Sequence, residues 1–401
     1  MPRPDRDDPQ SPAMPRRWLA VAAYTFGVTM LGTTLPTPLY AIYQRQWGFS
    51  GLVSTVVFAT YAVGVIAALV LLGRSSDTAG RRPLLAVGLA FSAASGVCFL
   101  LAESLPLLFA GRLLSGLSAG VFTGTATTAV VELAGRVPRA RAALVATAVN
   151  MLGLGSGPLL AGALAEWAPA PLRTPYLVHL ALLVPAAIGL ARLPETVRDT
   201  GPLRVRPLRP TVPESVRAAF WPAALSGFAG FATLGLFTAV EPRFLSEVLG
   251  VSDHLAAGAV VFGVFAASTL AQVLTTRAAP ARALPLACAA LVLGMLLVVL
   301  ALRSSSAPLL IAGSLVTGAG QGTALRAGIG ALTRLSPPGR GGEVTSTLFV
   351  VLYVAISVPV VGVGLLAAGI GIVDAALVFA LAVAALAVVA TLLLWRRPVT
   401  A

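Results

Sequence analysis

The sequence of 401 residues contains no lysine, few charged residues of any kind and only two cysteines. Charged residues make up 11% of the chain, whereas a typical soluble domain has about 25%. The chain therefore lacks the solvated surface that a soluble fold of this size needs. Cys98 and Cys288 both lie inside apolar runs, which argues against a structural disulfide and leaves too few ligands for a metal site.

The patterns that catalysis requires are also missing. The chain has two histidines, and it shows no phosphate-binding loop, zinc-ligand spacing or Ser-His-Asp arrangement. We therefore expect no catalytic residues, no enzyme activity, no cofactor and no metal, and a gradient rather than ATP as the energy source. The net charge of +13 is compatible with nucleic acid, but the arginines cap apolar segments and form no basic face. No nucleic-acid partner is expected.

Apolar sequence of membrane-spanning length is abundant. Hydrophobic residues make up 57% of the chain, and a spanning helix needs about 20 mostly apolar residues. The pattern predicts an all-α membrane protein with twelve transmembrane helices in the lipid bilayer. The twelve segments are 18–42, 52–72, 83–102, 106–131, 142–166, 174–193, 218–243, 255–276, 283–302, 307–332, 344–369 and 373–395. The first is too long for a cleaved signal peptide and is expected to be retained.

The arginines are distributed unevenly between alternate loops. With the N-terminus placed inside, the inner segments hold 22 of the 28 arginines and the outer loops hold four, which are Arg45, Arg173, Arg243 and Arg303. Basic loops stay in the cytoplasm. We therefore expect a multi-pass protein of the cell (inner) membrane with both termini cytoplasmic.

The two halves of the chain repeat each other. With a shift of 202 residues, 106–120 falls on 308–322 with eight of fifteen positions identical, and Gly162 falls on Gly364. Parallel repeats of six helices place a substrate site near the midplane between the halves. The expected divisions are an N-tail 1–17, a six-helix bundle 18–193, a linker 194–217, a second bundle 218–395 and a C-tail 396–401.

The loop between the second and third segments carries the most specific motif. Residues 73–82 read Gly-Arg-Ser-Ser-Asp-Thr-Ala-Gly-Arg-Arg. This spacing resembles the loop 2-3 signature of the major facilitator superfamily. The resemblance implies a gate in which the Asp caps the start of helix 11 and one of the paired arginines binds an acid on helix 4. The alternative is that the arginines only anchor the loop at the membrane surface. The predicted gate residues are Gly73, Asp77, Gly80, Arg81, Arg82 and Glu132.

Arg112 lies inside the fourth segment and is followed by Gly116 and Gly120. A charge at membrane depth is costly unless it faces protein or water, so it is functional by default. The run resembles the helix 4 motif of drug:proton antiporters, in which the Arg influences protonation of a nearby acid. The alternative is that this side chain extends to the outer membrane interface. Ser314 occupies the corresponding position of the repeat, so the fold itself does not require the arginine.

The fifth segment contains Gly153, Gly157, Pro158 and Gly162. Small residues allow helices to approach closely, and proline frees a backbone carbonyl. The order resembles the helix 5 motif of antiporters, with Ala161 in place of one glycine. General small-residue packing is the alternative interpretation.

The proton carrier is harder to place, because the first segment has no acid. It contains Pro36-Thr-Pro38, which partly matches a signature of twelve-helix drug exporters. We expect Glu241, near the outer end of the seventh segment, to carry the proton with Arg112 tuning it; a solvated helix end is the alternative. Asp77 and Glu132 are the next candidates for the proton carrier. Polar candidates for the substrate cavity are Tyr24, Thr29, Thr33, Asn150, Gln321, Arg326 and Tyr353.

The resemblance extends over residues 15–397 and implies a secondary transporter of the major facilitator fold. We expect a monomer that exports a small amphipathic or drug-like molecule by alternating access, with the proton as coupling ion. Two alternatives remain open. One is efflux of a sugar or another metabolite, and the other is a non-transporting membrane sensor with the same fold.

Overall fold

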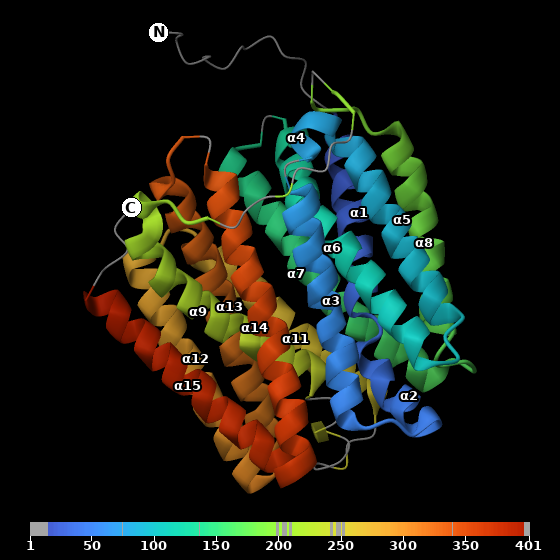
Figure 1. Ribbon diagram of the computed structural model, residues 1–401, viewed down its shortest axis with the longest axis vertical. Coiled ribbons are helices and arrows are strands. Elements are labelled where there is room, and N and C mark those ends of the chain that lie inside the picture. The colour runs from blue at the N-terminus through green and yellow to red at the C-terminus, as the bar shows by residue number, and fades with distance from the viewer. Residues whose placement is uncertain are drawn as a thin grey trace.

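The computed structural model describes residues 15–396 apart from 74, 136, 198–199, 203–206, 208–210, 241–243, 246–249, 251–252 and 339. The described residues form helices and connecting turns, arranged in two bundles that lie side by side (Figure 1). Each bundle contains six long helices that alternate in direction, and the connections between them are short. The predicted all-α fold with twelve membrane-length helices is confirmed.

The N-bundle is built from the first half of the chain. Its elements are α1 (Arg16–Thr34), the 3₁₀ turn η1 (Thr37–Leu39), α2 (Tyr40–Trp47), α3 (Gly51–Leu72), α4 (Ser76–Ala79), α5 (Arg81–Leu100), α6 (Leu105–Leu133), α7 (Arg139–Trp167) and α8 (Thr174–Arg192). The C-bundle follows. It consists of α9 (Glu214–Ala239), α11 (His254–Leu274), α12 (Pro280–Ser304), α13 (Ala307–Leu335), α14 (Gly341–Ile370) and α15 (Ile372–Arg396).

The long helices define two ends of the molecule. The linker end is the end at which α1 begins and α8 ends, so that the connection between the bundles starts there. The far end is the opposite one, at which α2, α7 and α14 end. Each long helix runs from one end to the other.

The sequence predicts a single helix over 18–42, but in the structure the first spanning segment is interrupted. α1 ends at Thr34, and a 3₁₀ turn follows before α2 begins at Tyr40. Pro36 and Pro38 lack the N–H groups that would continue the helical hydrogen-bond ladder. Carbonyl groups near the end of α1 are therefore left for other partners.

α13 differs from the other long helices in composition. Within the described part of the chain, eleven helical segments are long and apolar enough to cross a membrane, with α1 to α2 counted as one, and α13 is not among them. It has 29 residues, so its length suffices. Its glycines, Thr317, Gln321 and Arg326 make it less apolar, and most of these polar groups are buried against neighbouring helices.

The two bundles touch mainly through α7 with α11 and through α3 with α14. Among the described residues, the hydrogen bonds and the ring contact that join the bundles lie at the middle or the far end of the molecule. Close approaches occur in the same region, because Gly258 of α11 packs on the backbone of Pro158 and Gly364 of α14 packs on the side chain of Thr55. The interface is therefore closed toward the far end.

Candidate functional site

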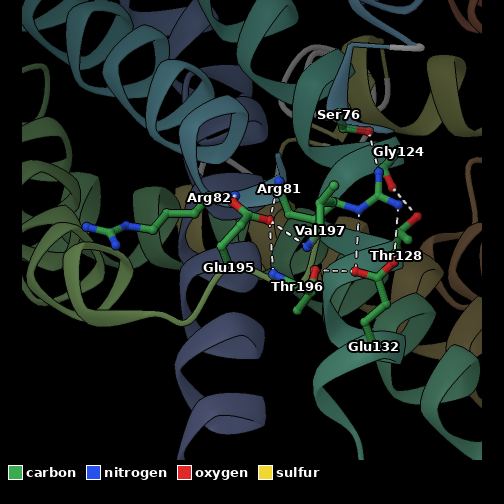
Figure 2. A network of polar contacts seen from close by, with 9 residues as sticks. All are labelled: Ser76, Arg81, Arg82, Gly124, Thr128, Glu132, Glu195, Thr196 and Val197. Atoms are coloured by element: carbon green, nitrogen blue, oxygen red, sulfur yellow. Dashed lines mark hydrogen bonds and ion pairs between the residues drawn. The ribbon is translucent and has the colours of Figure 1, made fainter. Parts of the chain in front are cut away.

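A network of polar contacts joins α4, α5, α6 and the start of the linker at the linker end (Figure 2). Arg81, the first residue of α5, places Nη2 3.1 Å from Oε1 of Glu132 on α6. The same guanidinium donates to the Ser76 hydroxyl at 2.7 Å, and the Thr196 hydroxyl donates to Glu132 at 2.5 Å. Of the two arginines that the sequence offered as partners for Glu132, Arg81 is the one that binds it.

Glu195, just after α8, ties the start of the linker to the start of α5. Its carboxylate accepts the backbone N–H groups of Arg81 at 2.8 Å and Arg82 at 2.9 Å. Burial alone would raise the pKa of this carboxyl, but these donors and the N–H groups of Val197 and Thr196 outweigh it and lower the pKa below its usual range. The ionised form is thus held at a helix N-terminus, where negative charge is stabilised.

Gly80 is needed for this arrangement on two grounds. Its φ of +99° lies in a region that side chains rarely adopt, and a Cβ there would lie 2.6 Å from Oε2 of Glu195. Gly73, in contrast, continues α3 with an ordinary helical φ of −58°. Asp77 belongs to α4, but its side chain lies outside the described part of the chain. The proposed cap on helix 11 therefore stays a prediction.

Arg112 of α6 is fully buried inside the N-bundle, with 1% of its surface exposed. It donates to the carbonyl oxygens of Thr33 at 2.6 Å and Phe58 at 3.2 Å. Its guanidinium also lies over the rings of Phe58 and Tyr61. The side chain thus points into protein rather than toward the outer interface. Thr33 is free to accept because the break after α1 removes its usual helical donor.

Tyr61, which lies under this guanidinium, extends the buried polar group to the other bundle. Its hydroxyl hydrogen-bonds to Tyr353 of α14, which also hydrogen-bonds to Thr123 of α6. The ring of Tyr353 lies 6.1 Å from that of Tyr61 and 6.5 Å from that of Phe231 on α9, measured between ring centres. A chain of contacts therefore runs from Arg112 across the bundle interface.

The glycines of the helix 5 motif pack in two directions. A Cβ at Gly153 would lie 2.7 Å from the carbonyl oxygen of Gly27, and Gly157 packs even more closely on Leu31, so both glycines face α1. Pro158 and Gly162 instead face α11 of the other bundle. α7 therefore packs closely on helices of both bundles, and glycines without a side chain make these close contacts possible.

An ionic cluster lies beside this contact at the far end. His254, the first residue of α11, donates its backbone N–H to Glu166 of α7 at 3.2 Å, and its ring Nδ1 is 3.2 Å from the same oxygen. The other ring nitrogen lies 3.4 Å from Nη2 of Arg45 on α2. These polar contacts join the bundles where the backbones already touch.

The remaining predicted cavity residues are dispersed. The Tyr24 hydroxyl donates to the carbonyl oxygen of Leu182 on α8 at 3.0 Å. Thr29 is buried, and its hydroxyl donates to the carbonyl oxygen of Thr25. Arg326 donates to the α11–α12 connection, to Thr275, Thr276 and Ala278. Asn150 and Gln321 each hold a buried polar atom without a hydrogen-bond partner, although Gln321 accepts from Ser268 at 2.7 Å.

Several contributors were not singled out as site residues from the sequence, among them Glu195, Thr196, His254 and Tyr61. Glu195 could have been noticed as an acid three residues past a helix end in a loop otherwise rich in arginine. His254 follows an N-capping Asp253 at the start of a segment. Tyr61 carried no local signal. Glu241 lies outside the described residues, so its role also stays a prediction.

Comparison with known proteins places this geometry in a family. The family model described as Major Facilitator Superfamily matches residues 18–302. The triacylglyceride transporter of Mycolicibacterium hassiacum is 31% identical over 212 residues, which are 52% of this chain and 37% of that protein. Multidrug resistance protein 1 of Bacillus subtilis is 26% identical over 40% of this chain and 41% of its own length. The chain therefore matches less than half the length of these relatives.

A solved structure shows the same fold. A bacterial homologue of the human lysosomal transporter Spinster, in an inward-facing and unoccupied conformation, superposes with a TM-score of 0.71 and 16% sequence identity. The match covers 95% of this chain and 98% of that one.

Proposed function

Because this chain belongs to the Major Facilitator Superfamily and is a multi-pass membrane transporter, we propose that it exports a small amphipathic molecule by alternating access, in exchange for protons. The observation that carries this proposal is the uneven closure of the bundle interface. Contacts between the bundles gather at the middle and far end. A transporter that works by rocking two rigid repeats must hold one end closed while the other is accessible.

The orientation follows from the arginines. The linker end carries the starts of α1, α5 and α7 and the ends of α6 and α8, where most arginines lie. Basic segments remain in the cytoplasm, so we assign the linker end to the cytoplasm and the far end to the outside, in the inner membrane. In this orientation, the described conformation is closed to the outside.

The linker-end network supports a rigid N-bundle. Within a single bundle, the Arg81 side chain binds Glu132 and the Arg81 backbone binds Glu195, so these contacts tie α5, α6 and the start of the linker together. Such a unit rocks as one body and presents Asp77 to the other bundle when the cytoplasmic side closes. The gate assigned from the sequence is therefore retained as a proposal.

The proposed cargo is apolar or amphipathic. One relative carries the name triacylglyceride transporter and another multidrug resistance protein. The aromatic residues around Tyr353 at the bundle interface offer stacking and apolar contact to such a molecule. Efflux of a sugar would call for many more hydrogen-bonding groups at the interface, so it remains the less favoured alternative.

Protein reconstituted in liposomes tests the proposal directly. An imposed pH gradient should drive the accumulation of a lipophilic fluorescent dye, and a protonophore should abolish it. Flux that is independent of the pH gradient would refute proton antiport but would still show transport. No flux and no binding of any lipophilic compound would favour the sensor alternative.

The proton carrier can be tested in the same assay. Glu241→Gln should remove the pH dependence of transport while cargo binding persists. If pH dependence survives in this variant, Asp77 and Glu132 become the next candidates, and each can be replaced by its amide.

A further inference from the structure

A groove of about 540 Å³ lies between α5 and α8. These two helices pack side by side at the edge of the N-bundle that faces away from the C-bundle (Figure 1). The groove therefore belongs to the lipid-facing surface and is separate from the bundle interface discussed above. It is lined by Arg82, Ala86, Leu89, Ala90, Ala93, Leu180, Leu183, Val184, Ala187, Leu190 and Ala191.

The shape of the groove follows from the side chains on the two facing helices. Exposed alanines, including Ala86 and Ala90 on α5 and Ala187 on α8, leave space between the helices. Buried leucines, among them Leu89 and Leu183, form its floor. Every lining residue except Arg82 is apolar.

The length of the groove corresponds to one leaflet of a membrane. On α5 the lining runs from residue 82 to 93, and on α8 from 180 to 191. At about 1.5 Å per residue, each wall is roughly 16 Å long. Half of a hydrocarbon core of about 30 Å is about 15 Å. A single lipid chain that starts at the linker end would therefore fill the groove and end near the midplane.

The linker end of the groove is positively charged. Glu195 binds the backbone of Arg82 but not its guanidinium, which points away from the Arg81–Glu132 network in Figure 2. Within the described part of the chain, this guanidinium has no hydrogen bond or ion pair. Arg192, exposed at the end of α8, follows directly after the lining residue Ala191.

We propose that this groove binds one acyl chain of an anionic phospholipid of the cytoplasmic leaflet, with its phosphate held by Arg82 and Arg192. A groove without a charged residue would accept the acyl chain of any lipid. Basic groups at the cytoplasmic mouth of an apolar groove between helices select anionic headgroups. The leaflet rests on the orientation proposed above, whereas binding itself does not depend on transport.

The test compares lipids that differ only in headgroup. Purified protein is incubated with phosphatidylglycerol or phosphatidylcholine of identical acyl chains, and bound lipids are counted by native mass spectrometry. The wild type should retain one phosphatidylglycerol with an affinity about fivefold or more above that for phosphatidylcholine, as expected for a basic residue near an anionic headgroup. Arg82→Gln should remove the preference.

Matched variants separate the groove from general surface effects. Ala90→Phe, or Ala187→Phe on the opposite wall, should prevent retention of either lipid, because the phenyl ring fills the groove. Arg282→Gln, in the first turn of α12, and Ala385→Phe, exposed on α15, should behave like the wild type. Equal retention of both lipids by the wild type, an equal loss in Arg282→Gln, or normal retention in both groove-filling variants would overturn the proposal.

Discussion

Replacement of Gly258 by alanine should shift the protein away from the conformation in which the far end is closed. A methyl group added at Gly258 would overlap the carbonyl oxygen of Pro158 on α7 and lie 2.9 Å from its carbonyl carbon. Carbon atoms in favourable contact are about 3.5–4.0 Å apart. The two helices must therefore separate by roughly 1 Å to accommodate the new group.

The expected size of the population shift depends on which conformation bears the cost of the added methyl group. Overpacking typically costs about 1–3 kcal/mol. α7 and α11 belong to different bundles, so a state with the far end open relieves the overlap and bears none of it. A difference of about 1–3 kcal/mol changes the ratio of the two states by about 5–150-fold. The better helix propensity of alanine, about 1 kcal/mol, applies to both states and cancels.

Distances between spin labels measure this shift. Labels on Glu103→Cys and Ser304→Cys, exposed at the far ends of the two bundles, should show a larger population at long distance in Gly258→Ala. The native cysteines are replaced beforehand. Gly369→Ala is the control, since an added methyl there has nothing within 4 Å. Identical distance distributions in the two variants, with unchanged thermal stability, would refute the assigned role of this contact.

Three further variants probe the N-bundle. Arg112→Ala should lose proton-driven flux yet cost only about 1–3 kcal/mol of stability, the penalty for unpaired buried acceptors; a variant that still couples normally would contradict its role. Arg81→Gln and Glu132→Gln should be non-additive in a double-mutant cycle by about 0.5–1 kcal/mol, because the pair is partly exposed; additive melting data would show no coupling. Because the pKa of Glu195 is lowered in the fold, its ionised form stabilises the protein above the unfolded pKa of about 4.3, and this contribution is lost as the pH falls through the lowered value. Wild-type melting temperature should therefore fall more steeply on acidification than that of Glu195→Gln, and parallel curves would exclude this linkage.

The sequence alone was sufficient for the fold class and for the position of the main motifs. Continuous apolar runs of spanning length form helices in lipid, because a helix satisfies every backbone group within its own segment. Local composition therefore predicts each spanning helix, and Arg placement and the repeat predict the two halves. Even the break after α1 could have been read from Pro36 and Pro38, since proline removes a donor wherever it occurs.

Only the tertiary structure decided which distant groups meet. Glu195 binds the backbone of Arg81 across 114 positions of sequence, and Arg112 reaches the Thr33 carbonyl across 79. No local pattern encodes such pairs, because they depend on how whole helices pack. The same holds for the contact of His254 with Glu166 and for the groove between α5 and α8. Periodicity identifies the faces of a helix in lipid poorly, because apolar residues face both lipid and protein, so only packing shows which of them line a site.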